Sequence, residues 1–219
     1  MSAIHLRVVR LVRAAVLAMS VGALAVAVSV PAQANDPAKA DASRVIVTRV
    51  IDLSDETMPE SKLARAAYEQ VAQFPDEVVE IPGAVALPAG VNLSPGEVVQ
   101  VDYADGVVVH AAPAAGCTIT RVANKPIKYT AATPHRATAT HSVALTSGCS
   151  NGRYFGELLR GTAPNGFSVA MKEVSGTPNT TTFWATYKNC QTTASWKYYS
   201  ETSGVGGVKT SASATLACF

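Results

Sequence analysis

Two glutamates are candidates for catalysis by their residue type. Glu157 and Glu173 lie on successive strand-like runs, and two carboxyl groups roughly 5 to 10 Å apart can hydrolyse a glycosidic bond. By simple alternation, Glu173 falls on the inward face of its run. The spacing does not require the two carboxylates to meet, so a small secreted hydrolase is kept as an alternative and not as the main prediction.

His141 forms a second candidate set with Glu157 and Arg153. A nuclease needs a base, an acid and a cation near a phosphate, and these three residues supply those types. His135 and His141 could share a metal ion, but their spacing is not a recognised ligand pattern. The sequence has no His-Glu-x-x-His, glycine-rich phosphate loop or Cys-x-x-Cys motif. We therefore expect no metal and no cofactor, and the interpretation leans against an enzyme.

Aromatic residues near the C-terminus favour binding over catalysis. In the run 181–188, alternation leaves Trp184 and Thr186 on the polar face, and in the next run Lys197 and Tyr199 read as outward. If the two runs pair with Trp184 opposite Tyr199, these four residues form an exposed face. Such a face suits a protein hot spot or a sugar-stacking platform. The alternative is that a second layer covers this face and makes Trp184 part of the core.

The first 34 residues have the three parts of a secretory signal. These are the basic residues Arg7, Arg10 and Arg13, the apolar run 14–30 and the small-x-small sequence of residues 32–34. The alternative is an uncleaved anchor, because the 17 residues of the apolar run approach the shortest membrane-spanning helix. We predict cleavage after Ala34 and a secreted, extracellular mature chain without a membrane span.

Charge divides the mature chain into two unlike halves. Residues 35–116 contain 5 Lys and Arg against 13 Asp and Glu, a net of −8, whereas residues 117–219 contain 10 against 3, a net of +7. The acidic half could dock on the basic half and mask or gate it, or the halves could be domains of different composition. The basic residues are scattered along the sequence and not clustered, so we expect no specific nucleic acid partner.

All four cysteines lie in the basic half, and an exported chain is expected to pair them in two disulfides. A disulfide at the base of an antiparallel hairpin should have a turn at its midpoint. Cys117 and Cys149 centre on the turn-like residues 132–134, and Cys190 and Cys218 centre on the glycine-rich residues 202–207. This argument favours Cys117 with Cys149 and Cys190 with Cys218.

The basic half is rich in β-branched and aromatic runs separated by Gly, Pro, Asn and Ser. About seven short strands in this length predict an antiparallel β-sandwich or barrel. In the run 167–174, alternation predicts that Phe167, Val169 and Met171 point inward. The predicted strands cover residues 118–122, 138–145, 153–160, 167–174, 181–188, 194–200 and 208–217.

The sequence of the acidic half predicts a small α+β unit at residues 44–110. A strand is expected at 44–51 and a helix at 57–73, with Leu63, Ala67, Val71 and Phe74 forming an apolar stripe. Asp105-Gly106 between the apolar runs 98–103 and 107–110 predicts a hairpin. The Ala- and Pro-rich residues 111–116 read as a linker, and residues 35–43 as an N-terminal tail.

These observations favour a secreted, non-catalytic binding protein. Its expected partner is an extracellular protein or a surface glycan, held by the basic domain, with the acidic unit docking on that domain or gating it. One alternative is a secreted precursor that releases the basic domain as an antibacterial toxin or inhibitor. The other alternative is the small secreted hydrolase or nuclease described above.

Overall fold

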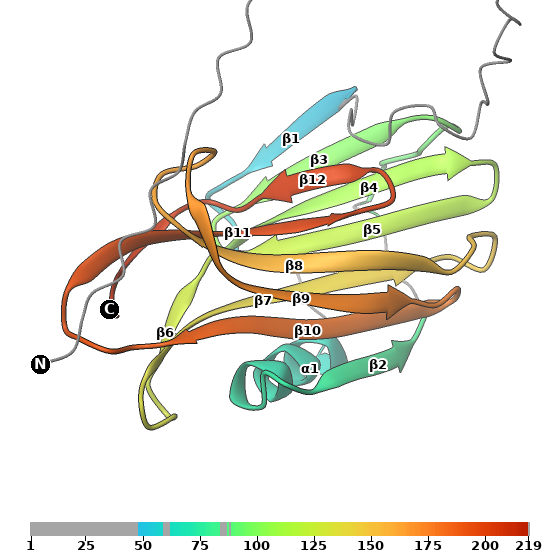
Figure 1. The fold of residues 1–219 in the computed structure, drawn as a ribbon. Helices are drawn as coiled ribbons and strands as arrows, with labels where there is room; N and C mark the ends of the chain where they lie inside the picture. Colours follow the sequence, from blue (N-terminus) through green and yellow to red (C-terminus); the bar gives the residue numbers. More distant parts are fainter. Residues whose placement is uncertain (1–47, 59–61, 84–86, 88, 219) are drawn as a thin grey trace, which may run out of the picture. The chain divides into compact units, whose positions relative to one another are not determined.

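The computed structural model describes residues 48–58, 62–83, 87 and 89–218. The predicted signal peptide and N-terminal tail lie outside these residues. The described chain forms two β-sheets and one helix (Figure 1), which confirms an all-β, sandwich-like fold with a small helical unit towards its N-terminal side. Within the described residues, no helix has the length and apolar character needed to cross a membrane.

The larger sheet has eight strands and takes segments from both charge halves of the sequence. Seven strands follow the spatial order β1, β3, β4, β5, β7, β10 and β2, and the short β6 pairs with β7. β1 pairs with β3 in parallel, and the other pairs are antiparallel. The strands are β1 Arg49–Leu53, β2 Val78–Pro82, β3 Val98–Tyr103, β4 Gly106–Ala114, β5 Cys117–Asn124, β6 Ile127–Tyr129, β7 Arg136–Leu145 and β10 Thr180–Asn189.

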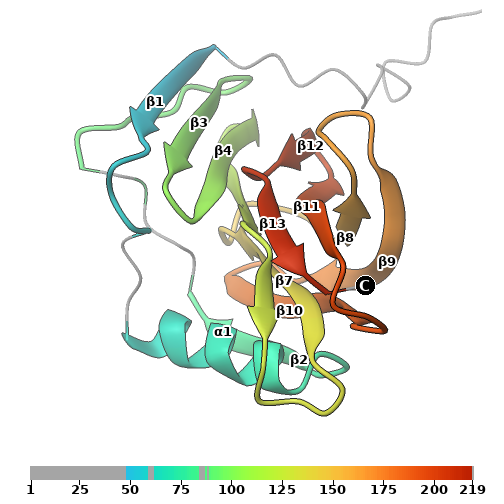
Figure 2. The same cartoon turned by 90° about the vertical axis from the view of Figure 1, so that its left-hand side faces the viewer.

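The smaller sheet has five strands and comes entirely from the basic half. Its order is β12, β11, β8 and β9, with β13 also paired with β11. Figure 2 shows these strands as a layer beside the larger sheet. The run predicted at 208–217 is divided here into two short strands, and the other predicted runs of the basic half each match one strand. The strands are β8 Gly152–Arg160, β9 Phe167–Gly176, β11 Ser195–Gly204, β12 Gly207–Thr210 and β13 Ala214–Ala217.

The helix α1 (Lys62–Gln73) covers the outward face of the larger sheet. Ala67 and Val71 of its apolar stripe are buried and pack with Phe183 and Ala185 of β10. The Tyr68 hydroxyl also lies 3.1 Å from the Ser142 hydroxyl of β7. The outer members of the predicted stripe, Leu63 and Phe74, remain exposed, so only the middle of the stripe contributes to the core.

The strand β10 has its opposite faces buried by different layers. On the outward side, Phe183 packs edge-on against the Tyr68 ring, with centroids 4.9 Å apart. On the inward side, Trp184 joins the core between the sheets. That cluster also contains Ile119, Val143, Leu145, Tyr154 and Val174, beside the disulfide of Cys117 and Cys149.

The predicted linker and domain boundary look different in the structure. Residues 111–114 belong to β4, and Ala111 and Ala112 are buried. Only Ala115 and Gly116 form the turn into β5, and Gly116 adopts a left-handed φ of 77° that favours glycine. Strands from both sides of the predicted boundary share one hydrogen-bonded sheet, because main-chain pairing does not depend on the charge of the side chains.

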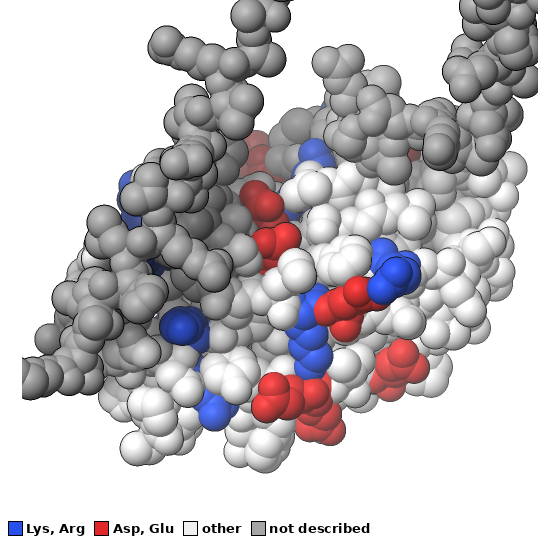
Figure 3. All heavy atoms as spheres, in the orientation of Figure 1, with Lys and Arg blue, Asp and Glu red and all other residues white. Residues whose placement is uncertain are grey.

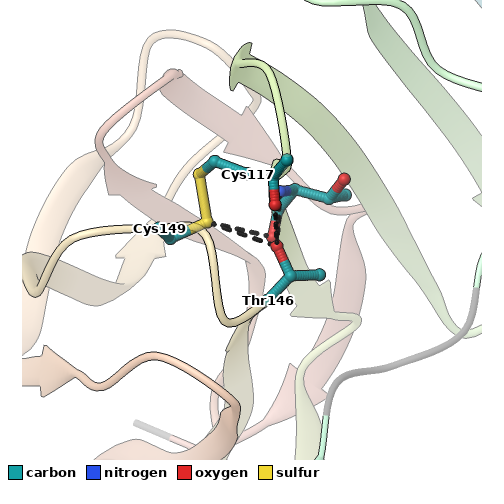
Figure 4. Close-up of a disulfide and its surroundings, with 5 residues drawn as sticks. Cys117, Thr146 and Cys149 are labelled. Carbon is teal, nitrogen blue, oxygen red and sulfur yellow. Dashed lines mark hydrogen bonds between the residues drawn. A yellow bond between two sulfur atoms is a disulfide. The ribbon is translucent and has the colours of Figure 1, made fainter.

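Both predicted disulfides are confirmed. Cys117 and Cys149 bond with Cα atoms 4.5 Å apart, and Cys190 and Cys218 bond with Cα atoms 4.4 Å apart. The midpoint argument works for the first pair because β5 and β7 are antiparallel neighbours, as in the pairing of Ile119 with Leu145. Beside this disulfide, the Thr146 hydroxyl accepts a hydrogen bond from the Thr118 amide at 2.8 Å and lies 3.6 Å from the Cys149 sulfur (Figure 4).

The prediction that Phe167 and Met171 point inward is wrong. They are 54% and 64% exposed, whereas Val169 is half-buried and Val174 is buried. The register pairs Met171 with Glu157, and the ladder between β8 and β9 shifts at a bulge beside Leu158. A bulge changes which side chains share a face, so an alternation counted along one strand cannot hold through it.

Candidate functional site

The predicted binding face does not form. Trp184 and Tyr199 are each 0% exposed and Thr186 is 3% exposed, while only Lys197 is exposed. The reason is topological: β10 pairs with β7 and β2 in the larger sheet, whereas β11 belongs to the smaller sheet. Trp184 therefore lies in the core between the layers, which is the alternative that the sequence left open.

His141 lies in the same core, at the centre of a polar network. Its Nδ1 is 2.9 Å from the Thr202 hydroxyl and its Nε2 is 3.0 Å from the Thr186 hydroxyl. Burial lowers the pKa of His141 to about 3, because the charged imidazolium would lose its hydration. Its neighbour Gly156 on β8 has no room for a side chain, since an added Cβ would lie 2.6 Å from the His141 ring. The imidazole is thus enclosed and cannot reach a substrate.

The remaining histidines do not come together with His141. His110 is buried on the outward face of the larger sheet, where its Nδ1 lies 2.9 Å from the Thr120 hydroxyl and burial lowers its pKa to about 4. His135 is exposed in the loop before β7. The two histidines considered as a metal pair are therefore separated, one in solvent and one in the core. No group of three His, Cys, Asp or Glu residues suited to a metal occurs among the described residues.

Glu157 and Glu173 do not lie together as a catalytic pair, and each has a different charged neighbour. Glu173 is exposed and forms an ion pair with Arg153, which also corrects its predicted inward position. Glu157 instead faces Glu201 across β8 and β11. The pKa of Glu201 is raised, first by burial and also by the charge of Glu157, although a hydrogen bond from Thr210 opposes this. Arg153 and Glu157 thus lie away from His141, and the nuclease set is not assembled.

A Gly-x-Ser-x-Gly sequence at residues 148–152 also lacks the setting of a catalytic nucleophile. A nucleophile elbow requires a strand followed by a sharp turn into a helix. Here Ser150 is exposed between two strands, β7 and β8, and its neighbour Cys149 is held in a disulfide. The serine therefore does not sit on such an elbow.

The structure brings together a different group of residues on three neighbouring strands of the smaller sheet. Arg160 ends β8, Phe167 begins β9 and Trp196 lies near the start of β11. The guanidinium carbon of Arg160 is 4.6 Å from the centre of the Phe167 ring and 4.4 Å from the centre of the Trp196 ring. Phe167 and Trp196 are 54% and 42% exposed. This is a cation–π cluster with two aromatic rings open to solvent.

The larger sheet adds a similar pair at the same end. The Arg136 guanidinium carbon lies 4.6 Å from the centre of the Tyr187 ring. The two sheets are joined here by the disulfide of Cys190 and Cys218, and the Cys190 amide donates to the His135 carbonyl at 2.7 Å. Residues near this disulfide therefore come from both layers.

We call this end the basic pole. It is made by residues 127–136, 158–168, 187–197 and 210–218, which contain no Asp or Glu. In the view of Figure 3, the charged atoms at the left of the described surface are blue, whereas red and blue lie side by side nearer its centre. The cations of the basic pole are Lys128, Arg136, Arg160, Lys188 and Lys197, and its aromatic residues are Tyr129, Phe167, Tyr187 and Trp196.

Sequence reasoning missed the basic pole for a specific reason. Trp196 reads as core by alternation with Tyr198, and Phe167 reads as inward. Both residues stand at the start of a strand, where the opposing layer no longer covers them. Their exposure could have been predicted from their position beside the turn-rich residues 161–166 and 190–194. Residues next to loops are exposed more often than residues at strand centres.

Comparison with known proteins gives no guide to the use of this surface: no family model matches the sequence, and no curated protein or solved structure is significantly similar to it.

Proposed function

We propose that this protein is exported and acts as a non-catalytic binding protein that recognises a cell-surface glycan through the basic pole. The observation that carries the proposal is the pair of exposed rings, Phe167 and Trp196, that flank Arg160. Large aromatic side chains beside an arginine are typical of binding hot spots. A flat ring also offers an apolar surface to the C–H face of a sugar.

A binding role is supported by the environment of the groups that could do chemistry. His141 and His110 are enclosed and held neutral by burial. Glu173 is neutralised by Arg153. General acid and base catalysis needs a group within hydrogen-bond reach of the substrate, and the enclosed histidines do not meet this requirement.

Export is supported by the N-terminal signal sequence and by the two disulfides, since disulfides persist in oxidising compartments. The precursor alternative would separate residues 117–219 from the preceding strands. This would remove β4 from β5 and β2 from β10, and would expose the edges of both inner strands. We therefore favour an intact mature chain.

The proposal is tested by displaying the secreted chain, residues 35–219, on arrays of polysaccharides and of extracellular proteins. The variant Phe167→Ala should weaken glycan binding about tenfold, the loss expected for a hot-spot residue worth about 1.4 kcal/mol. Phe74→Ala is the matched control, because Phe74 is also 54% exposed but directly follows α1 and belongs to none of the four segments of the basic pole.

Each result has a clear meaning. Selective loss with Phe167→Ala supports glycan binding by the basic pole. Equal binding by both variants would overturn the assignment of the surface. Binding to proteins alone, still lost with Phe167→Ala, would replace the glycan by a protein partner.

A further inference from the structure

We propose that Asn151 is a site of spontaneous deamidation, and that the hydroxyl of Tyr199 protects Asn165 in the basic pole from the same reaction. These two asparagines are the only ones in the sequence that are followed by glycine. The inference goes beyond the proposed function, because it does not depend on what the basic pole binds. It is argued from the chemistry of the Asn-Gly pair and from the different surroundings of its two copies.

Deamidation of an asparagine needs no enzyme. The backbone nitrogen of the following residue attacks Cγ of the side-chain amide and forms a new C–N bond, which closes a succinimide ring. The Cγ–Nδ2 bond breaks, and the amide nitrogen leaves as ammonia with the proton of the attacking N–H. Water then opens the ring, giving aspartate when it breaks the new bond, or isoaspartate when it breaks the original peptide bond. A following glycine favours the attack, because it has no Cβ in the way and its backbone rotates easily.

The chain around Asn151 permits this reaction. Asn151 is exposed and belongs to no helix or strand. Gly152 is the first residue of β8 and pairs with Gly176, the last residue of β9. On its other side, the pairing of β8 with β11 ends at Tyr154 and Gly204 and does not reach Gly152. The ends of strands open at almost no cost in free energy, so the Gly152 nitrogen can turn towards the Asn151 side chain.

Asn165 is also exposed, but the backbone around it is held in place. The Gly166 N–H donates to the Tyr199 hydroxyl at 2.9 Å, and the Asn165 N–H donates to the Thr162 carbonyl at 2.8 Å. Gly166 lies so close to Tyr199 that an added Cβ would be 2.5 Å from its ring. The loop must therefore break a hydrogen bond and open before the Gly166 nitrogen can reach Cγ of Asn165.

This protection preserves the basic pole. Asn165 lies in its segment 158–168, two residues before Phe167. Deamidation there would add a carboxylate to segments that contain no Asp or Glu, and isoaspartate would lengthen the main chain just before Phe167. Asn151 lies outside the four segments, so its deamidation leaves the arginine–aromatic cluster unchanged. The protein is thus expected to age at one Asn-Gly pair without altering its proposed binding surface.

The test follows both asparagines in one incubation of the secreted chain, residues 35–219, at mildly alkaline pH. Mass spectrometry of the digested protein gives the rate of deamidation at each position, and heavy-oxygen water marks the product formed during the incubation. The same chain, reduced and unfolded in urea, gives the reference rates. We expect comparable rates in the unfolded chain. In the folded chain, Asn165 should react about tenfold more slowly than Asn151, because its loop must open first.

Two tyrosine variants test the role of the hydroxyl. Tyr199→Phe keeps the ring and removes the oxygen that accepts the Gly166 N–H. It should speed deamidation of Asn165 about fivefold, the factor that corresponds to one hydrogen bond, and leave the rate at Asn151 unchanged. Tyr198→Phe is the matched control, because Tyr198 is the neighbouring buried tyrosine and its hydroxyl donates instead to the Cys218 carbonyl at 3.0 Å.

Each outcome supports or overturns one part of the inference. A rate at Asn151 that is as slow as the rate at Asn165 in the folded chain would overturn the assignment of the modification site. Equally fast reaction at both positions would overturn the protection of Asn165. An unchanged rate at Asn165 in Tyr199→Phe would overturn the role of the hydroxyl. Equal acceleration by Tyr198→Phe would also overturn it, because a general loss of stability would then open the loop.

Discussion

The imidazole of His141 stacks on the indole of Trp184, with ring centres 5.5 Å apart and ring planes inclined by 20°. The two hydroxyl partners of this imidazole come from opposite sheets, Thr186 from β10 and Thr202 from β11. A neutral imidazole can donate from one nitrogen and accept at the other. His141 thus connects the two layers, and its burial favours the neutral form of the ring.

The burial of His110 and His141 predicts that acid destabilises the protein. The pKa values of His110 and His141 are lowered to about 4 and about 3, below the usual value of about 6.5 in an unfolded chain. As pH falls below 6.5, the unfolded chain takes up protons first, so stability is lost between pH 6.5 and the folded values. We expect a loss of about 2 kcal/mol per histidine between pH 7.5 and pH 5, measured by urea unfolding.

Histidine variants provide the control for this prediction. His135→Gln is the matched control, because His135 is exposed in the loop before β7. His141→Gln should remove about half of the pH dependence. In the intact protein, NMR titration should also show two histidines that stay neutral at pH 5. A free energy of unfolding that is flat from pH 7.5 to pH 5 would contradict the burial of these two side chains.

The close approach of β8 to the His141 and Trp184 rings predicts that Gly156→Ala is destabilising. A Cβ at this position would lie 2.6 Å from the His141 ring and would also overlap the Trp184 indole nitrogen. Overpacking of this kind costs about 1 to 3 kcal/mol. Thermal or urea unfolding measures the loss.

A double-mutant cycle tests the physical cause. Trp184→Phe removes part of the obstructing indole, so the double variant should be less destabilised than the sum of the two single variants. Strict additivity would show that Gly156 is needed for a reason other than the lack of room.

The two disulfides should contribute similarly to stability but differently to binding. Their sequence separations are 32 and 28 residues, which correspond to about 3 to 4 kcal/mol each in the loop-entropy model. Cys190 and Cys218 lie at the basic pole, so replacing both with Ser should weaken ligand binding as well as stability. Replacing Cys117 and Cys149 should reduce stability alone. Binding measured well below both melting temperatures separates the two effects, and equal loss of binding would argue against the basic pole.

Cleavage between β4 and β5 should not separate the two halves of the chain. A protease site inserted at the Ala115-Gly116 turn would leave β4 paired with β5 and β2 paired with β10. These contacts are main-chain hydrogen bonds and apolar packing, which salt screens weakly. The cleaved fragments should co-elute in size-exclusion chromatography even in 1 M NaCl. Separation at high salt alone would mean that charge attraction, and not the shared sheet, holds the halves together.

Local sequence signals predicted the strands and the disulfides well, because each depends on residues near a turn. Asp105-Gly106 marks the hairpin of β3 and β4, and turn-like residues at the midpoints identify both cysteine pairs. These features require no knowledge of which strands meet across the core.

Local sequence signals could not predict which layer buries each face of a strand. Alternation separates Trp184 from Phe183 correctly, but both faces of β10 are buried, one by the smaller sheet and one by α1. Charge composition placed a boundary at residues 111–116, although the backbone pairing of β4 with β5 crosses it. The arginine–aromatic contacts of the basic pole likewise depend on strand neighbours that are far apart in sequence.

The pairing of Val78 with Trp184 sets the order in which the fold can be completed. The N-terminal strands are synthesised first, yet β2 has no neighbour in the sheet until β10 has emerged. Long-range pairing of this kind makes folding slow. The β2 edge of the larger sheet therefore closes only after β10 has been synthesised, whereas the hairpins β3–β4 and β4–β5 can pair before that point.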